Sequence, residues 1–192
     1  MSTLAAEVSV PNDIASLALA AKQAGRRLAI LPTAEKDRIL LQIADSLERN
    51  ALAVLAANAE DAALAADLVE TGRMSQALYH RLLLSPEKYK AMIDGVKAVA
   101  KMPDPAGQVL LRTLLDDGLV LEKVSVPLGL LAVIFEARPD AITQISALAI
   151  KSGNAVILKG GREVERTMRA VLDAIHDGIA SAQLESSAVG VN

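Results

Sequence analysis

The sequence contains no cysteine and no tryptophan among its 192 residues, and aromatic residues make up only 2% of it. The absence of cysteine excludes disulfide bonds, thiolate metal ligands and a cysteine nucleophile within these residues. Because aromatic side chains are so scarce, a core has to be built from leucine, isoleucine, valine and alanine. The chain is 52% hydrophobic, and its length suffices for one domain with a substantial core.

A strong charge of one sign and long apolar runs are also lacking. The 20 basic and 23 acidic residues are mixed along the chain, so there is no electrostatic footprint for nucleic acid or an anionic membrane. The longest apolar run, 128–135, is too short to span a bilayer. The first residues, MSTLAAEVSVPND, do not resemble a secretory signal. These absences favour a cytoplasmic protein without nucleic-acid or membrane partners.

Amphipathic helices are predicted throughout the first hundred residues, which are rich in alanine. The spacing of apolar residues predicts helices over 13–31, from Thr33, from Asn50 to about Leu68, from Ser75 to about Leu84, and from Ser85 to Pro103. Three polar residues are expected to cap helices: Asn50, Ser75 and Ser85. Three charged residues lie opposite the apolar face of the second helix and are expected to be solvated: Lys36, Arg38 and Glu48.

The pattern changes after residue 105. The segments QVLLRTLL (108–115) and LVLEKVSV (119–126) are rich in strand-forming residues, and DDG separates them. This arrangement predicts a β-hairpin. Such a hairpin serves either as a subunit contact or as an ordinary edge ribbon of the same domain.

The segment 126–163 is predicted to form a strand, a helix, a second strand and a turn into another helix. Residues 130–135 and 155–158 are continuous apolar runs, typical of parallel strands buried on both faces. Apolar residues at helical spacing lie between them, and SGN at 152–154 is suited to end that helix. Two parallel strands joined by a helix form a right-handed βαβ unit. The last ten residues are expected to lead toward another strand.

Ligands of such units bind beyond the carboxyl ends of the strands, which here are followed by 136–139 and 159–162. Glycines allow a phosphate to approach the backbone, and the start of a helix favours negative charge. Lys159, Gly160 and Gly161 are therefore candidate nucleotide ligands. The alternative is a plain strand-to-helix turn that uses glycine for positive φ. The segment matches neither the G-x-G-x-x-G motif nor a Walker loop.

Arg162 follows these glycines in the predicted first turn of a helix, where a cation opposes the helix dipole. This placement suits binding of an anion such as the 2′-phosphate of NADP. The alternative is a solvated arginine paired with Glu163 or Glu165.

Glu136 and Arg138 are candidate pocket residues after the first strand. Arg138 can bind a carboxylate or phosphate bidentately, and Asp140 is expected to cap the next helix. Alternatively, Glu136 and Arg138 pair with each other or with surface partners. No catalytic or metal-binding constellation surrounds the two histidines, His80 and His176.

The stretch VPLGLLAVIFEARPDAITQISALAIKSGNAVILKGGREV closely resembles the γ-glutamyl phosphate reductase (glutamate-5-semialdehyde dehydrogenase) family of the aldehyde dehydrogenase superfamily. The segments EARPD, KSGNAVIL and KGG are specific to this family. The segments AAKQAGRRLA, KDRILLQIADSL and HRLLLSPEKYKAMIDGVKAVAKMPDPAGQ agree with it in order. The resemblance covers nearly all of 12–182.

The resemblance implies an α/β, aldehyde-dehydrogenase-like fold with an incomplete parallel βαβα nucleotide-binding unit. Four regions are expected along the chain: a helical part of the cofactor domain (1–105), a β-hairpin or oligomerisation arm (106–126), the first half of the NADP-binding unit (127–182) and a truncated tail (183–192). Family members are considerably longer, and their catalytic domain is expected to be absent here.

The implied activity is that of an oxidoreductase of proline biosynthesis, the NADPH-dependent reduction of L-glutamate 5-phosphate to L-glutamate 5-semialdehyde with release of phosphate. In the family, a cysteine thiolate attacks the acyl phosphate, and hydride then reduces the thioacyl enzyme. Lys159 matches the cofactor-binding lysine, and Arg162 stands where NAD-preferring relatives carry an acid. Glu136 and Arg138 lie in the loop that borders the pocket. No catalytic residue is assigned to this chain.

Three hypotheses follow from the resemblance. The first is a reductase fragment that is inactive alone and that, when complete, belongs to a homo-oligomer. The second is a non-enzymatic subunit-interaction module or a remnant of the reductase. The third is a weak nucleotide-binding protein without chemistry.

Overall fold

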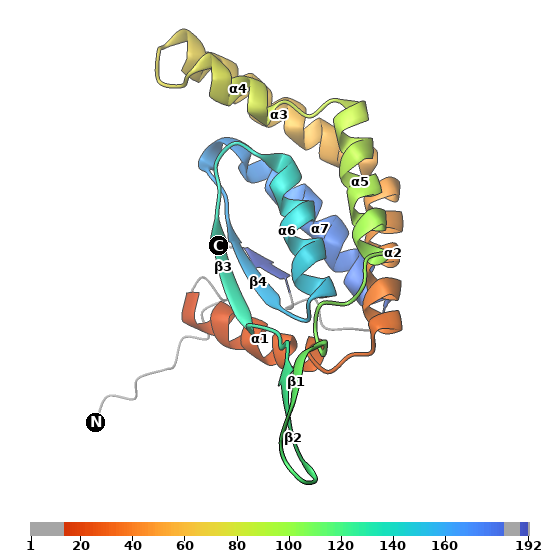
Figure 1. The fold of residues 1–192 in the computed structure, drawn as a ribbon. Coiled ribbons are helices and arrows are strands. Elements are labelled where there is room, and N and C mark those ends of the chain that lie inside the picture. Colours follow the sequence, from red (N-terminus) through yellow and green to blue (C-terminus); the bar gives the residue numbers. More distant parts are fainter. Residues whose placement is uncertain (1–13, 183–188, 192) are drawn as a thin grey trace, which may run out of the picture.

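The structure is a computed structural model that describes residues 14–182 and 189–191. A parallel sheet in the order β3-β4-β5 has helices on both of its faces (Figure 1). Its strands are β3 (Leu130–Ile134), β4 (Ala155–Lys159) and β5 (Val189–Val191). A separate antiparallel hairpin projects from the domain and consists of β1 (Val109–Asp116) and β2 (Leu119–Val124). The last ten residues were expected to form a loop that leads toward another strand, but three of them already form β5, whereas residues 183–188 lie outside the described part.

The helices follow the predicted order. They are α1 (Ile14–Leu28), α2 (Thr33–Arg49), α3 (Ala51–Glu70), α4 (Gln76–Leu82), α5 (Pro86–Ala100), α6 (Pro139–Lys151) and α7 (Glu165–Ser181), and a short 3₁₀ helix, η1 (Arg162–Val164), precedes α7. The Ser75 and Ser85 hydroxyls cap α4 and α5 as predicted, each accepting a backbone N–H at 3.2 Å. The prediction for Asn50 is wrong, because its side-chain amide donates to the Ser46 carbonyl at 2.9 Å at the end of α2.

Strand β4 forms the centre of the domain. Ala155 and Ile157 pack with Ala21 of α1 on one face. Val156 and Leu158 belong to the main core on the other face, together with buried side chains of α6 and α7. Helices α2 and α5 cover α6 and α7 from outside (Figure 1). The predicted apolar faces of α2, α5 and α7 are all buried in this core.

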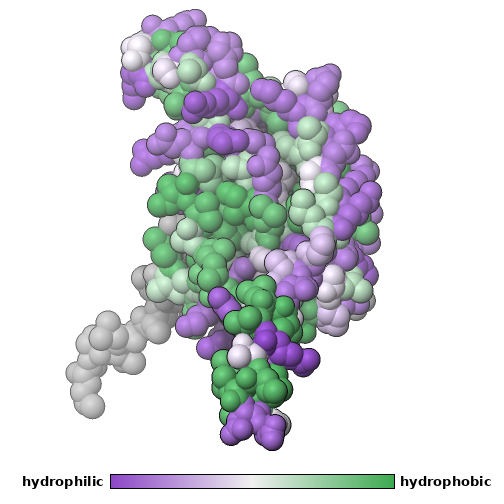
Figure 2. Space-filling view, viewed as in Figure 1, coloured by the Kyte–Doolittle hydropathy of each residue, from purple (hydrophilic) through white to green (hydrophobic). Residues whose placement is uncertain are grey.

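Strand β3 differs from its prediction, although its apolar sequence resembles that of β4. Among the described strands, β3 pairs with β4 alone, and none of its residues is fully buried. Ile134 is 80% exposed. Figure 2 shows apolar side chains gathered on the hairpin and on the surface near β3. An edge position therefore leaves β3 only partly covered within the described part of the chain.

The prediction that Lys36 is solvated is wrong, because this residue is only 2% exposed. Its Nζ donates to Asp104 Oδ2 at 2.8 Å, and the Thr33 hydroxyl donates to the same oxygen at 3.1 Å. Burial by itself raises the pKa of Asp104, but hydrogen bonds from Lys36, the Ala106 N–H and Thr33, with the positive charge of Lys36, outweigh burial and lower it. The pair fixes the start of α2 to the segment after α5.

We expect the substitution Asp104→Asn to remove a pH-dependent part of the stability. Because the folded-state pKa of Asp104 is lowered, its contribution is present above the ordinary carboxyl pKa of about 4 and is lost as the pH falls below it. At neutral pH, the variant leaves Lys36 buried without a carboxylate and should lose roughly 3 kcal/mol. Urea denaturation between acidic and neutral pH measures both effects. An acid dependence equal to that of the wild type would contradict this account.

Helix α7 packs closely against the backbone of α2 at Gly178. A Cβ at this position would lie 2.5 Å from the Ile43 Cα, so Gly178→Ala should lower the free energy of unfolding by about 1–3 kcal/mol. Gly95 of α5 is the matched control, because its Cβ position is open, and Gly95→Ala should raise stability by up to roughly 1 kcal/mol. Chemical denaturation of both variants checks this, and effects of the same sign would refute it.

Candidate functional site

The two candidate segments lie side by side at one edge of the sheet, although α6 separates them in the sequence. Ile134 and Lys159 pair in parallel register, and the Phe135 N–H donates to the Lys159 carbonyl at 3.1 Å. The loop 136–139 and the turn 159–162 therefore start from neighbouring strand ends. This adjacency is what the βαβ prediction requires.

The loop 136–139 leads directly into α6, with Pro139 in the first turn. Asp140 does not cap this helix, contrary to the prediction, because it lies inside the first turn and no side-chain cap is formed. Its Oδ2 instead accepts hydrogen bonds from Arg138 Nη2 and Gln144 Nε2, each at 3.2 Å. Arg138 is thus held by the aspartate two positions later and does not pair with Glu136.

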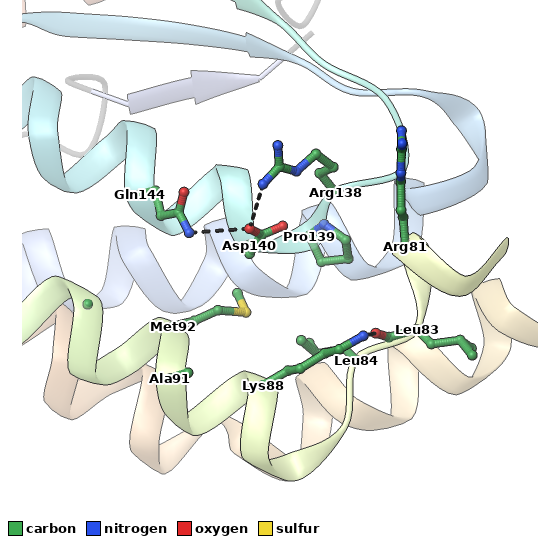
Figure 3. A pocket seen from close by; sticks show the side chains of 11 residues that line it. Arg81, Leu83, Leu84, Lys88, Ala91, Met92, Arg138, Pro139, Asp140 and Gln144 are labelled. Atoms are coloured by element: carbon green, nitrogen blue, oxygen red, sulfur yellow. Dashed lines mark hydrogen bonds and ion pairs between the residues drawn. The ribbon is translucent and has the colours of Figure 1, made fainter. Parts of the chain in front are cut away.

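A cleft of about 600 Å³ opens beside this loop, between the start of α6 and the α4–α5 region (Figure 3). Arg138, Asp140 and Gln144 line it from α6 and the residue before it. Arg81 and Lys88 contribute two further cations from α4 and α5. Glu136 is exposed and does not line the cleft. The structure therefore brings Arg138 to a cleft rich in cations and leaves Glu136 outside it. Arg81 and Lys88 were not predicted from the sequence.

Gly160 and Gly161 provide space rather than unusual dihedral angles. Neither has a positive φ, and φ of Gly161 is −73°. The alternative of a turn that uses glycine for positive φ is therefore wrong. A Cβ at Gly160 would lie 2.8 Å from Met168 Sδ, and one at Gly161 would overlap the Glu163 carboxylate. Both glycines let neighbouring side chains approach the turn.

Lys159 and Arg162 present exposed cations at this turn. Lys159 Nζ donates to the Gly160 carbonyl at 2.8 Å. The Arg162 guanidinium forms no ion pair with any residue that the structure describes, so the predicted alternative of pairing with Glu163 or Glu165 is not observed. Both side chains remain accessible from solvent.

The start of α7 is already occupied by a carboxylate that was not predicted from the sequence. Asp61 of α3 is 2% exposed and accepts hydrogen bonds from the Thr167 N–H at 2.8 Å and the Thr167 hydroxyl at 2.7 Å. The negative charge favoured at a helix start is thus supplied from α3. A phosphate at the turn would have to rely on Lys159, Arg162 and the backbone of 160–162. Sequence patterns reveal caps that are local, whereas Asp61 lies 106 positions before Thr167.

Asn58 completes this buried network one helical turn before Asp61. Its Nδ2 donates to the Leu82 carbonyl at 2.9 Å and to the Thr167 hydroxyl at 3.2 Å, and its Oδ1 accepts the Leu84 N–H at 2.8 Å. The network therefore joins α3, α7 and the segment between α4 and α5. It links the wall of the cleft to the helix that follows the turn.

Neither histidine lines the cleft. His80 Nε2 contacts Gln76 Nε2 at 3.2 Å on the exposed side of α4. No cluster of three or more His, Cys, Asp or Glu side chains suited to a metal ion occurs in the described part of the chain. Within residues 14–182 and 189–191, no helix has both the length and the hydropathy needed to cross a lipid bilayer.

Comparisons with known proteins agree with the family resemblance found in the sequence. A γ-glutamyl phosphate reductase of Synechocystis is 48% identical over 176 residues, which are 92% of this chain and 40% of the relative. The crystal structure of γ-glutamyl phosphate reductase from Saccharomyces cerevisiae superimposes with a TM-score of 0.85 and 40% identity, and the match covers 92% of this chain and 45% of that one. No protein-family model matches. The chain spans about two fifths of the length of the curated relatives it matches, in their amino-terminal part.

The fold is shared more widely. A putative aldehyde dehydrogenase from Bacillus subtilis superimposes with a TM-score of 0.65 at 15% identity, over 92% of this chain and 35% of that one. This likeness concerns the fold alone. The predicted α/β, aldehyde-dehydrogenase-like fold is confirmed.

We expect Asp61→Ala to lower the free energy of unfolding by about 2 kcal/mol or more, because it leaves buried donors at the start of α7 without an acceptor. Arg166 pairs with Asp61 at 3.6 Å and with Glu60 at 3.2 Å. Glu60→Ala is therefore the matched control, since Glu60 shares this partner but is 68% exposed. This control should change stability by less than about 0.5 kcal/mol. Urea denaturation of the two variants measures the difference. Equal effects would show that the buried cap contributes nothing beyond a surface charge.

Proposed function

Because this chain is a homologue of part of the γ-glutamyl phosphate reductases, we propose that it holds NADP(H) and borders the substrate pocket of such an enzyme. The reaction is the reduction of L-glutamate 5-phosphate by NADPH to L-glutamate 5-semialdehyde and phosphate. The observation that carries the proposal is the adjacency of a turn with two exposed cations and a cleft lined by three more. A negatively charged dinucleotide and a phosphorylated substrate both require such surroundings.

The turn is the proposed nucleotide site. Lys159 is placed to contact a ribose hydroxyl or a phosphate. We propose that the backbone of Gly160 and Gly161 contributes beside it, with Gly161 half-buried and Gly160 buried against Met168. Arg162 is the residue we propose to bind the 2′-phosphate that distinguishes NADP from NAD. Its accessible guanidinium supports this role, since a bidentate arginine–phosphate contact needs a planar donor pair. The N–H groups of Arg166 and Thr167 at the start of α7 already donate to the Asp61 carboxylate. Binding of a phosphate at the turn therefore depends more strongly on the side chains of Lys159 and Arg162.

The cleft is the proposed substrate site. L-Glutamate 5-phosphate carries a phosphate and a carboxylate, which suit the cations Arg81, Lys88 and Arg138, and an ammonium group, which suits Asp140. We propose that Arg138 is the main contact, because it lies in the loop that connects β3 to the cleft. Glu136 is the less favoured candidate because it is exposed outside the cleft.

The 192 residues contain no cysteine, so they do not supply the thiolate that the family resemblance implies. We propose that this chain binds and orients the reactants, while the covalent step uses a cysteine that these residues do not contain.

The hairpin is the proposed contact with a second subunit in a homo-oligomer. Every residue of β1 and β2 is exposed, including apolar ones on both strands. Exposed apolar surface of this kind is typical of protein interfaces. We accordingly propose that 106–126 acts as the oligomerisation arm, 1–105 as the helical part of the cofactor domain and 127–182 as the first half of the NADP-binding unit.

Nucleotide titrations test the turn. Arg162→Ala should weaken NADPH binding by about tenfold, the equivalent of one charge-assisted contact, and should leave NADH binding unchanged. Arg169→Ala is the matched control, because Arg169 is an exposed arginine of the next helix that pairs with Glu165, and it should change neither affinity. Lys159→Ala should weaken both nucleotides. Equal loss of NADPH and NADH binding in Arg162→Ala would refute recognition of the 2′-phosphate.

A turnover assay tests whether this chain binds the reactants without performing the covalent step. Purified residues 1–192 supplied with NADPH and L-glutamate 5-phosphate should show no substrate-dependent oxidation of NADPH, because no thiolate is present. Turnover by this chain alone would contradict the proposed role.

A further inference from the structure

One carboxylate joins the two segments of the candidate site. The Glu163 Oε1 accepts a hydrogen bond from the backbone N–H of Ala137 at 2.8 Å. The backbone hydrogen bonds between the two strands end with the one from Phe135 to Lys159. Glu163 therefore continues the connection beyond the strand ends with a side chain, and it ties the loop 136–139 to the turn 160–164.

Ala137 needs this partner for two reasons. Its φ of 43° lies in the left-handed region, which is unfavourable for a residue with a Cβ. It is also 1% exposed, so its N–H would lack an acceptor if Glu163 were removed. The next residue is Arg138, whose side chain lines the cleft. The backbone conformation at Ala137 therefore sets the direction in which Arg138 leaves the loop.

Gly161 makes the contact possible. A Cβ on Gly161 would overlap the carboxylate group of Glu163, and the backbone of Gly161 has an ordinary conformation that any residue can adopt. The glycine is therefore required by the position of the Glu163 side chain and not by its own dihedral angles.

We propose that Glu163 is a positioning residue: its carboxylate holds Ala137 in the left-handed conformation and so presents Arg138 to the cleft from the neighbouring turn. What the loop and the turn bind rests on the proposed function, but the hydrogen bond and its effect on the loop do not. Glu163 acts through Ala137 and touches neither reactant in this scheme.

Amide hydrogen exchange at Ala137, followed by NMR on residues 1–192 without nucleotide, tests the proposal. Glu163→Ala should accelerate this exchange by about tenfold or more, because the acceptor is lost. Glu163→Gln keeps a side-chain carbonyl oxygen as acceptor and should restore the exchange to within roughly threefold of the wild type. Glu165→Ala is the matched control, since Glu165 is an exposed glutamate two positions later, and it should leave Ala137 unchanged.

A double-mutant cycle with Gly161 provides the second measurement. Gly161→Ala should accelerate exchange at Ala137 as Glu163→Ala does, because the new Cβ displaces the carboxylate. The double variant should be no faster than either single variant, since both remove the same hydrogen bond. If Glu163→Ala does not fold, Glu163→Gln and Gly161→Ala decide the question.

Unchanged exchange at Ala137 in Glu163→Ala, or additive effects of the two substitutions, would overturn the positioning role. A failure of the proposed function looks different: the wild-type chain would show no saturable binding of NADPH, while exchange at Ala137 would still respond to Glu163.

Discussion

The side chains of β4 alternate between the two faces of the sheet. The strand is therefore buried only when helices pack against both faces. Helix α1 covers Ala155 and Ile157, whereas α6 and α7 cover Val156 and Leu158. Hydrophobic burial is not directional, so the distances between these layers are set by residues that permit close approach. Gly25 of α1 against Ala155 and Gly178 of α7 against α2 are such positions. This packing positions the strand ends that carry the candidate site.

Much of this fold was predictable from the sequence, because helical spacing and short apolar runs are local signals. The faces of α5 and α7, the caps at Ser75 and Ser85, the hairpin and the βαβ unit all follow from them. Lys36 was mispredicted because its carboxylate partner lies 68 positions away, and periodicity does not report a distant partner. Strand β3 was mispredicted because an apolar run indicates a tendency to be buried, while its place at the edge of the sheet decides how much is covered.

The candidate site likewise contains residues that local sequence patterns predicted and residues that they did not. The loop after β3 and the turn after β4 were found because parallel strands bring their carboxyl ends together. Arg81, Lys88, Asn58 and Asp61 were missed, since they reach the site from helices distant in sequence. The glycines of the turn were recognised, but their physical reason was not: the space they leave is used by Met168 and Glu163. Only the tertiary structure identifies which neighbour a glycine accommodates.

The buried pair of Lys36 and Asp104 has a consequence for the evolution of this chain. A change at either position alone leaves a charge without its counterpart at a buried position, so single steps at the two positions are strongly disfavoured. A simultaneous exchange of both residues for apolar side chains of similar size avoids that barrier. Related sequences should therefore show these two positions changing together, as a correlated pair, while the exposed ion pairs on the helices drift independently.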